Sequence, residues 1–333
     1  MPLVSSIILP HGAMTLDGGA AAGCSAAAVD RLHNLPETLK EDCQTLFKAC
    51  HEAAEIAKTT KPDVIFLNTP HGICLSNSHA VYINTKAKGN AEWNKQWTEY
   101  DVFVDLDVEL AKSFAAHLIQ DAIPAEEMKA FSSCEAPLRW GEVIPLWFVR
   151  DLTASGVKVV IFSNPLSRSR QFSLTDITKV GDSIAKFFDR LEQRVLYIVS
   201  GDLAHSHQTE CTMPLYLADP RWNMPTSDTA LPFDICVENW VKGIPYSPES
   251  KKRQTKTKEK HSSSWDSAAC SNAQKWISEA VDLKQEALSC GIYGFCLLQG
   301  ILANGLKKRN NFTAHLLCRL APTYYGMAAA VFL

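Results

Sequence analysis

The sequence lacks any apolar run of the roughly 20 residues that a helix needs to cross a bilayer. Its N-terminal residues Met1–Val4 lack the charged segment and the cleavage site of a secretory signal peptide. Basic charge is not in excess either, since 33 lysine and arginine residues face 36 acidic ones, for a net charge of −3. We therefore expect a cytoplasmic protein with no membrane partner and no nucleic-acid partner.

Paired CxxC motifs are also missing, although the chain has 11 cysteines. A secreted disulfide framework is denser and is found in shorter chains, so the odd number of scattered cysteines argues against one. Most of them stand in apolar surroundings and are expected to be small, buried hydrophobic residues in a reducing compartment. Examples are Cys74, Cys236, Cys296 and Cys318.

The chain contains neither an internal repeat nor a convincing linker, so its 333 residues are predicted to form a single domain. A strand at Val4–Leu9, an amphipathic helix at 39–59 and a strand at Val64–Leu67 form one β-α-β unit. A second unit runs from Val157 to Val199. Such units are typical of a parallel sheet and predict an α/β fold.

One stretch shows no periodicity. Residues 251–260 are rich in lysine and are followed by three serines. We expect a flexible surface insertion at 249–266, because a run of like charges without apolar positions has nothing to pack. A nuclear-localisation or anion-binding role is the less favoured alternative.

Three histidines follow apolar runs. His11 and His71 each stand in a Pro-His-Gly sequence after a predicted strand, and His205 ends the sequence Gly201-Asp202-Leu203-Ala204-His205 after a third strand. Open α/β sheets present reactive groups at the carboxyl ends of their strands. A lone histidine after a strand is usually a turn or core residue, but the repeated pattern favours one shared site.

Two imidazoles at separate strand ends need a third donor to hold a metal. A carboxylate would complete the facial triad of non-haem iron(II) oxygenases, whereas a thiolate suits copper(I), zinc or a different iron chemistry. His205 could act as a base on a phenolic hydroxyl. Asp202 could orient that imidazole or cap the following turn. His79 is an alternative ligand or a substrate contact.

These stretches, in this order, resemble the B-type members of the class III extradiol ring-cleavage dioxygenases and the related Memo proteins. The likeness is greatest to the stand-alone members found with AMMECR-type domains. It covers the chain from end to end. The matching segments are Leu9-Pro10-His11-Gly12, Asn68-Thr69-Pro70-His71-Gly72, Trp140–Leu146, Val199–His205, Ser289-Cys290-Gly291 and Ala321–Met327.

The resemblance implies a single α/β domain over 1–333, with a central mixed, largely parallel sheet flanked by helices. It places the metal-binding histidines on His11 and His71 and the catalytic histidine on His205. The dioxygenases supply a glutamate as third ligand, but Memo proteins carry a Cys-Gly there, which matches Cys290. The nearest carboxylates, Glu279 and Glu286, do not match the motif.

A second departure from the family concerns Trp140, which stands where members often have a histidine. An indole there removes an acid/base group but can stack on an aromatic substrate. We expect His79, Trp140 and Tyr324 to contact the substrate.

The implied function is extradiol cleavage of a catechol by dioxygen, with Fe²⁺ as the expected cofactor and Zn²⁺ or Cu as alternatives. His205 and Asp202 are the expected catalytic residues, and a homodimer is one of the expected assemblies. The alternative is a Memo-like metal-binding protein without ring cleavage, active in redox handling or as a peptide-binding scaffold. A zinc-dependent hydrolase is a third hypothesis, which the lack of an evident metal-bridging carboxylate disfavours.

Overall fold

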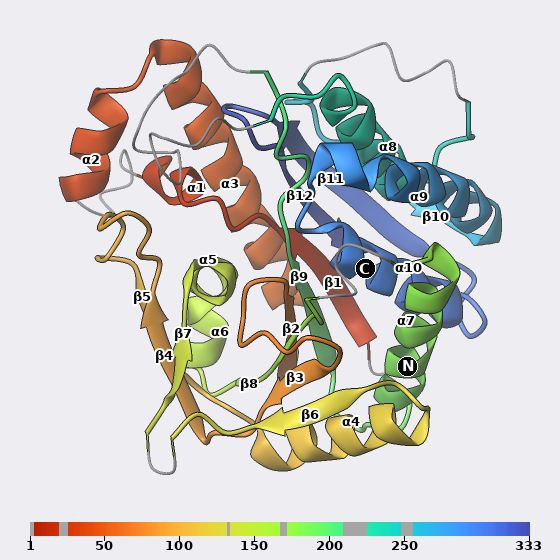
Figure 1. Cartoon of the computed structure of the whole chain (residues 1–333). Coiled ribbons are helices and arrows are strands. Elements are labelled where there is room, and N and C mark those ends of the chain that lie inside the picture. The colour runs from red at the N-terminus through yellow and green to blue at the C-terminus, as the bar shows by residue number, and fades with distance from the viewer. Residues whose placement is uncertain (1–2, 20–25, 132–133, 167–171, 209–224, 248–255) are drawn as a thin grey trace.

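The computed structural model describes residues 3–19, 26–131, 134–166, 172–208, 225–247 and 256–333. Its centre is a mixed sheet of nine strands (Figure 1). In spatial order these strands are β10 (His261–Trp265), β11 (Phe312–Leu320), β12 (Met327–Phe332), β1 (Leu3–Leu9), β9 (Val195–Ser200), β2 (Val64–Thr69), β8 (Lys158–Ser163), β3 (His79–Tyr82) and β6 (Ala125–Met128). The structure thus has the predicted α/β fold with a mixed sheet.

Strands β1, β9, β2 and β8 lie side by side and run parallel. Ile198 of β9, for example, pairs with Ile7 of β1 on one side and with Leu67 of β2 on the other. The antiparallel pairings lie outside this core, on the side of β12 and between β8 and β3. The carboxyl ends of β1, β9 and β2 therefore meet at one edge of the sheet.

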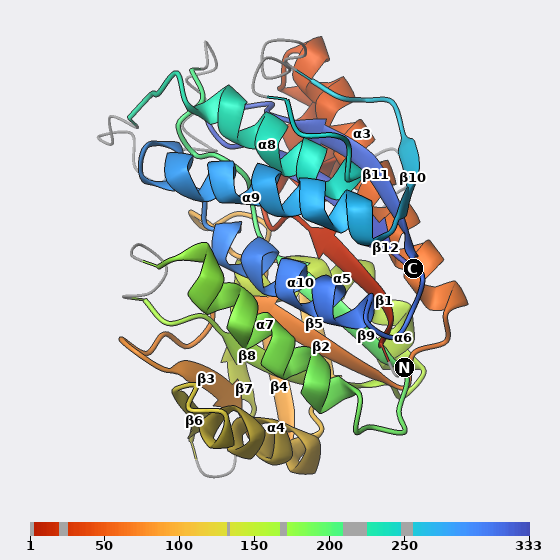
Figure 2. The same cartoon turned by 90° about the vertical axis from the view of Figure 1, so that its right-hand side faces the viewer.

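Side chains of the parallel strands alternate between two cores, as the two-residue period of a strand requires. Val64 and Phe66 belong to one core, and Ile65 and Leu67 to the other. The first core is covered by α4 (Val108–Gln120), α7 (Leu174–Phe188), α8 (Ala230–Lys242), α9 (Ser267–Ala287) and α10 (Ile292–Gly305), most of which face the viewer in Figure 2. The second is covered by α1 (Met14–Asp17), α2 (Ala26–His33), α3 (Glu37–Thr59), α5 (Trp140–Phe148) and α6 (Arg150–Ala154).

Residues 140–154 form two helices, α5 and α6, with Val149 at the junction. Helix α5 begins as early as Trp140, where the side chain of Glu142 accepts from the otherwise unpaired backbone N–H of the N-cap residue Arg139. Pro145 lies inside α5. It has no N–H to give to the carbonyl of Gly141 four residues earlier, so this carbonyl lacks its usual α-helical donor.

A small sheet of three strands, β5 (Asp101–Asp105), β4 (Lys86–Asn90) and β7 (Ala136–Leu138), lies beside α5 (Figure 1). The segment between β4 and β5 holds Asn94, Lys95 and Trp97 at positive φ. This turn brings Trp93 against Trp140, with ring centroids 4.8 Å apart.

The prediction of a flexible insertion at 249–266 is wrong for the second half of that range. Residues 261–265 form β10, the edge strand paired with β11, and Thr257 bridges to Arg319. Lys256 and Lys258 both form ion pairs with Asp42 of α3. Residues 249–255 lie outside the described part of the chain.

Among the cysteines expected to be buried, Cys236, Cys296 and Cys318 are buried, but Cys74 is exposed and donates to the carbonyl of Gly72. Within the ranges that the structure describes, no helix combines the length and the hydrophobicity needed to cross a membrane.

Candidate metal centre

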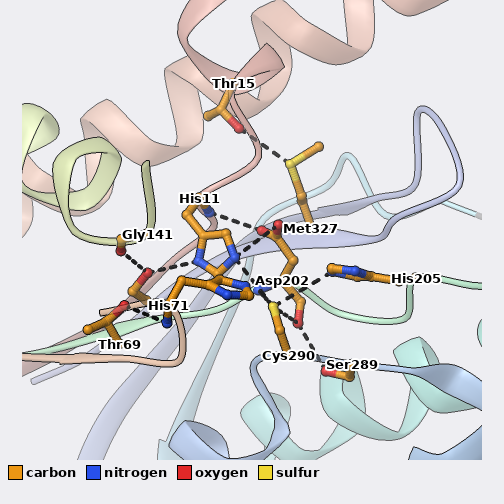
Figure 3. Close-up of polar contacts among 11 residues, drawn as sticks. His11, Thr15, Thr69, His71, Gly141, Asp202, His205, Ser289, Cys290 and Met327 are labelled. Carbon is orange, nitrogen blue, oxygen red and sulfur yellow. Dashed lines mark hydrogen bonds and ion pairs between the residues drawn. The ribbon is translucent and has the colours of Figure 1, made fainter. Parts of the chain in front are cut away.

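Three adjacent parallel strands deliver the predicted histidines to one place (Figure 3). His11 follows β1, His71 follows β2, and Asp202 and His205 follow β9, which lies between them. The rings of His11 and His71 have centroids 4.8 Å apart and are nearly perpendicular, at 80°. The carboxyl-edge location is the one at which open α/β sheets bind ligands.

Cys290 joins this group from the turn between α9 and α10. Its Sγ lies 3.3 Å from Nε2 of His11 and 3.7 Å from Nε2 of His205. One donor atom from each of His11, His71 and Cys290 lies within 4.8 Å of the others. Asp202, His205 and Cys290 form a second such group, so the thiol stands at the centre of the cluster.

The tautomer of His11 follows from its neighbours. The hydroxyl of Ser200 donates its only proton to the carbonyl of Gly141, at 2.5 Å. It must therefore accept from Nδ1 of His11, at 2.9 Å. Nδ1 carries the proton, and the lone pair of Nε2 is directed toward Cys290. A bare Nε2 facing a thiol is the arrangement that metal coordination requires.

Among the described residues, the carboxylate of Asp202 makes no hydrogen bond to the ring of His205, which was one of the two roles considered for it. Its Oδ1 instead accepts from the backbone N–H of His11, at 3.0 Å, and its Oδ2 lies 3.4 Å from Nε2 of His11. The backbone of His205 is held by the carbonyl of Ala287. Asp202 thus joins the end of β9 to the end of β1.

Burial keeps the imidazoles of the cluster neutral. It lowers the pKa of His11 and of His71 to about 3 each, and the neighbouring imidazole of the cluster adds to each shift. The pKa of His205 falls to about 4, again mainly through burial. Burial raises the pKa of Asp202 to about 6, and that of the Cys290 thiol well above its usual value. Neutral imidazoles are competent ligands, whereas the thiol needs a cation to become a thiolate.

The two glutamates near Cys290 in sequence do not reach the cluster. Glu279 accepts from the hydroxyl of Tyr246, and Glu286 accepts from the hydroxyl of Ser227. Asp202 is the carboxylate that lies beside the histidines.

Aromatic rings flank the cluster on two sides. Trp140 lies beside His71, with ring centroids 5.6 Å apart, and is backed by Trp93. Tyr324 and Tyr325 lie beside His205, at 6.2 and 5.9 Å between ring centroids. Burial raises the pKa of Tyr324 to about 12, with contributions from Asp202 and Cys290. Two of the three residues predicted to contact the substrate, Trp140 and Tyr324, thus lie next to histidines of the cluster.

His79 stands apart from these groups. It is buried in β3, where Nδ1 contacts the carbonyl of Pro124 and Nε2 lies 3.2 Å from the hydroxyl of Tyr293. Both ring nitrogens therefore have protein partners. This predicted alternative ligand or substrate contact does not belong to either of the donor groups formed by the described residues.

The glycines after the two histidines serve close packing. A Cβ at Gly12 would lie 2.4 Å from the ring of Tyr325, and one at Gly72 would lie 2.6 Å from the hydroxyl of Tyr82. Neither glycine has a positive φ. They are therefore needed for space and not for a left-handed turn.

Sequence reasoning missed Ser200, Tyr82 and Tyr325. Ser200 carries a usable signal, since it is a polar residue at the end of an apolar strand, next to Gly201-Asp202. The sequence gives no such signal for Tyr82 and Tyr325, because aromatic residues at such positions usually belong to the hydrophobic core.

Comparison with known proteins bears on the identity of this site. None of the curated proteins matches the chain. The family model for the catalytic LigB subunit of aromatic ring-opening dioxygenase matches residues 28–231. This match includes His71, Trp140, Asp202 and His205, while His11 and Cys290 lie outside it. Since the match covers more than half of its residues, the chain belongs to the LigB family of ring-opening dioxygenase catalytic subunits.

Proposed function

We propose that this chain is a non-haem, metal-dependent extradiol dioxygenase that opens a catecholic ring with dioxygen. The observation that carries the proposal is the convergence of His11, His71 and Cys290, whose donor atoms lie within 4.8 Å of one another, with His205 beside them. This convergence occurs in a member of a ring-opening dioxygenase family.

The donor set fits a divalent metal. His11 presents a deprotonated Nε2 to the cluster, and the ring nitrogens of His71 have no hydrogen-bond partner among the described residues. Fe²⁺ is the metal that the family chemistry calls for, and Zn²⁺ or Cu are alternatives that a thiolate also suits. When bound, Fe²⁺ would supply the redox chemistry that lets dioxygen react with an aromatic ring.

His205 is the acid/base residue of this proposal. Its pKa of about 4 leaves it neutral at pH 7, so it can accept a proton from a catechol hydroxyl and later return it. Asp202 positions the site, because its carboxylate accepts from the backbone N–H of His11 and so links the turn before His205 to the residue that follows β1.

The walls of the site suit an aromatic substrate. Trp140 lies beside His71, and Tyr324 lies beside His205. Stacking or edge contacts with such rings are worth about 0.5–1.5 kcal/mol beyond simple burial. We propose that both residues hold the catechol ring.

A second candidate function rests on Cys290. A thiol at the third donor position is softer than the carboxylate of the oxygenase facial triad and favours tight binding of copper(I) or zinc. Under this hypothesis the protein binds a metal without cleaving rings, and it serves redox handling or acts as a scaffold.

One experiment separates the two. The purified protein is analysed for metal, loaded with Fe²⁺, and supplied with a panel of catechols while oxygen uptake and the absorbance of ring-opened product are recorded. Uptake that is lost in His205→Ala supports the dioxygenase. Tight Zn²⁺ or copper binding with no oxygen uptake for any catechol would overturn it in favour of the metal-binding protein.

A further inference from the structure

The first turn of α5 touches the supports of both metal-binding histidines. On one side, the carbonyl of Gly141 accepts the hydroxyl proton of Ser200, which in turn orients His11. That carbonyl is available to Ser200 because Pro145, four residues later in the helix, has no N–H to donate to it. A proline within α5 and a serine at the end of β9 thus cooperate to set the tautomer of His11.

On the other side, the same turn anchors the loop that carries His71. Tyr82 donates its hydroxyl proton to Oε1 of Glu142, at 3.1 Å, and accepts from the backbone N–H of Ile73, at 2.6 Å. Glu142 is itself fixed, because its Oε2 accepts from the backbone N–H of Arg139 at 3.1 Å. Ser163 donates to the carbonyl of Ile73, so both backbone groups of this residue are held.

The first turn of α5 and the loop that carries His71 are in close contact. A Cβ on Gly141 would lie 2.8 Å from Cβ of His71, and a Cβ on Gly72 would lie 2.7 Å from Oε1 of Glu142. Glu142 and Tyr82 are buried. A shift of the α5 turn would therefore be transmitted to His71 directly.

We propose that the first turn of α5, through Gly141 and Glu142, is the positioning element for both imidazoles of the metal centre. Ser200 fixes the orientation and tautomer of His11, and Tyr82, anchored on Glu142, fixes the loop of His71. Neither Ser200 nor Tyr82 belongs to the donor groups found among the described residues, so both are assigned as positioning residues. The inference rests on the proposed function, because it presupposes that His11 and His71 bind a common ion.

Metal affinity tests this proposal without turnover. Metal-free protein is titrated with Co²⁺ alone, and its visible ligand-field and thiolate charge-transfer bands are followed. We expect Ser200→Ala and Tyr82→Phe each to weaken Co²⁺ binding by about 10- to 100-fold, the usual cost of losing an outer-shell partner. Ser200→Thr, which keeps the hydroxyl, should retain most of the affinity and the wild-type spectrum.

The chain offers matched controls for both substitutions. Among the described residues, the buried hydroxyls of Ser6 on β1 and Tyr197 on β9 have no hydrogen-bond partner. Ser6→Ala and Tyr197→Phe therefore remove the same atoms at a similar depth without breaking a contact to α5. Both should bind Co²⁺ as tightly as the wild type.

Glu142→Gln gives a second route if Ser200→Ala or Tyr82→Phe fails to fold. A glutamine side chain has one carbonyl oxygen, whereas Glu142 accepts from two donors, the hydroxyl of Tyr82 and the backbone N–H of Arg139. One of these two hydrogen bonds is therefore lost, and the Co²⁺ affinity of the Glu142→Gln protein should also fall. Wild-type affinity in every folded variant, or equal losses in the controls, would overturn the positioning role. Failure of the wild type to bind Co²⁺ at all would instead overturn the proposed function, and the positioning role with it.

Discussion

The thiol of Cys290 lies 3.3 Å from Nε2 of His11, although 279 positions separate the two residues in the chain. The contact joins the turn before α10 to the end of β1. Because Ser200 leaves Nε2 of His11 without a proton, the thiol faces a lone pair. This relationship makes the cluster a donor set and leads to the following predictions.

Replacing Cys290 by serine should cost more metal affinity than the about 10- to 100-fold expected for an outer-shell partner, since a direct donor is lost. The measurement is Zn²⁺ or Co²⁺ binding to metal-free protein. Cys134→Ser, at an exposed cysteine, is the control and should bind normally. A Cys290→Ser protein with unchanged affinity would show that another group completes the site.

Replacing His205 by glutamine should lower kcat by about 10²- to 10⁴-fold, the range for loss of a general acid–base group, while Fe²⁺ still binds to the remaining donors. Steady-state oxygen uptake and metal analysis on the same preparation check both parts. His33→Gln, on the exposed face of α2, serves as control. Equal turnover in the two variants would exclude proton transfer by His205.

Trp140→Ala should raise KM for the catechol more than it lowers kcat, because the ring beside His71 contributes binding and no proton transfer. Trp140→Phe keeps a flat ring and should have a KM between those of wild type and Trp140→Ala. The measurement is the rate as a function of catechol concentration. A fall in kcat at constant KM would contradict a binding role for the indole.

Acid should destabilise the metal-free protein through its buried histidines. The unfolded chain protonates His71 near pH 6.5, whereas the folded protein resists protonation down to about 3. The stability contributed by neutral His71 is therefore fully present above pH 6.5 and is lost as the pH falls below it. At about pH 5 this loss is on the order of 1–2 kcal/mol.

Urea unfolding of wild type and His71→Asn at several pH values isolates this effect. The raised pKa values of Asp202 and Glu142, about 6 and about 7, act in the opposite direction and are present in both proteins. The free energy of unfolding should thus fall less steeply toward low pH in His71→Asn. Parallel curves would contradict the buried, neutral state of His71.

A buried ion pair outside the metal centre should matter for stability. Arg319 is fully buried and donates to Glu238, which also accepts from Thr257. Arg319→Leu should cost about 3–5 kcal/mol in the free energy of unfolding, because it leaves a buried carboxylate short of a partner. The exposed pair of Arg194 and Asp63 provides the comparison. Arg194→Leu should cost at most about 1 kcal/mol.

Local patterns in the sequence were sufficient to predict the strands and helices that build the parallel core. Strand β2 and helix α3 match their predicted ranges closely, because apolar periodicity and β-branched residues report local structure directly. The position of His11, His71 and His205 after strands was likewise readable. Parallel strands end at one edge, so a common location for the three could be expected before any coordinates.

Only the tertiary structure decided which groups support the histidines of the cluster. The partner of Asp202 is the backbone of His11, and the Ser200 hydroxyl bridges His11 to Gly141. Lys256 likewise pairs with Asp42 of α3, and Thr257 bridges to Arg319 of β11. Such contacts join residues far apart in the chain and depend on which strands become neighbours. Local sequence determined where the histidines stand along the chain, and long-range packing determined what each of them touches.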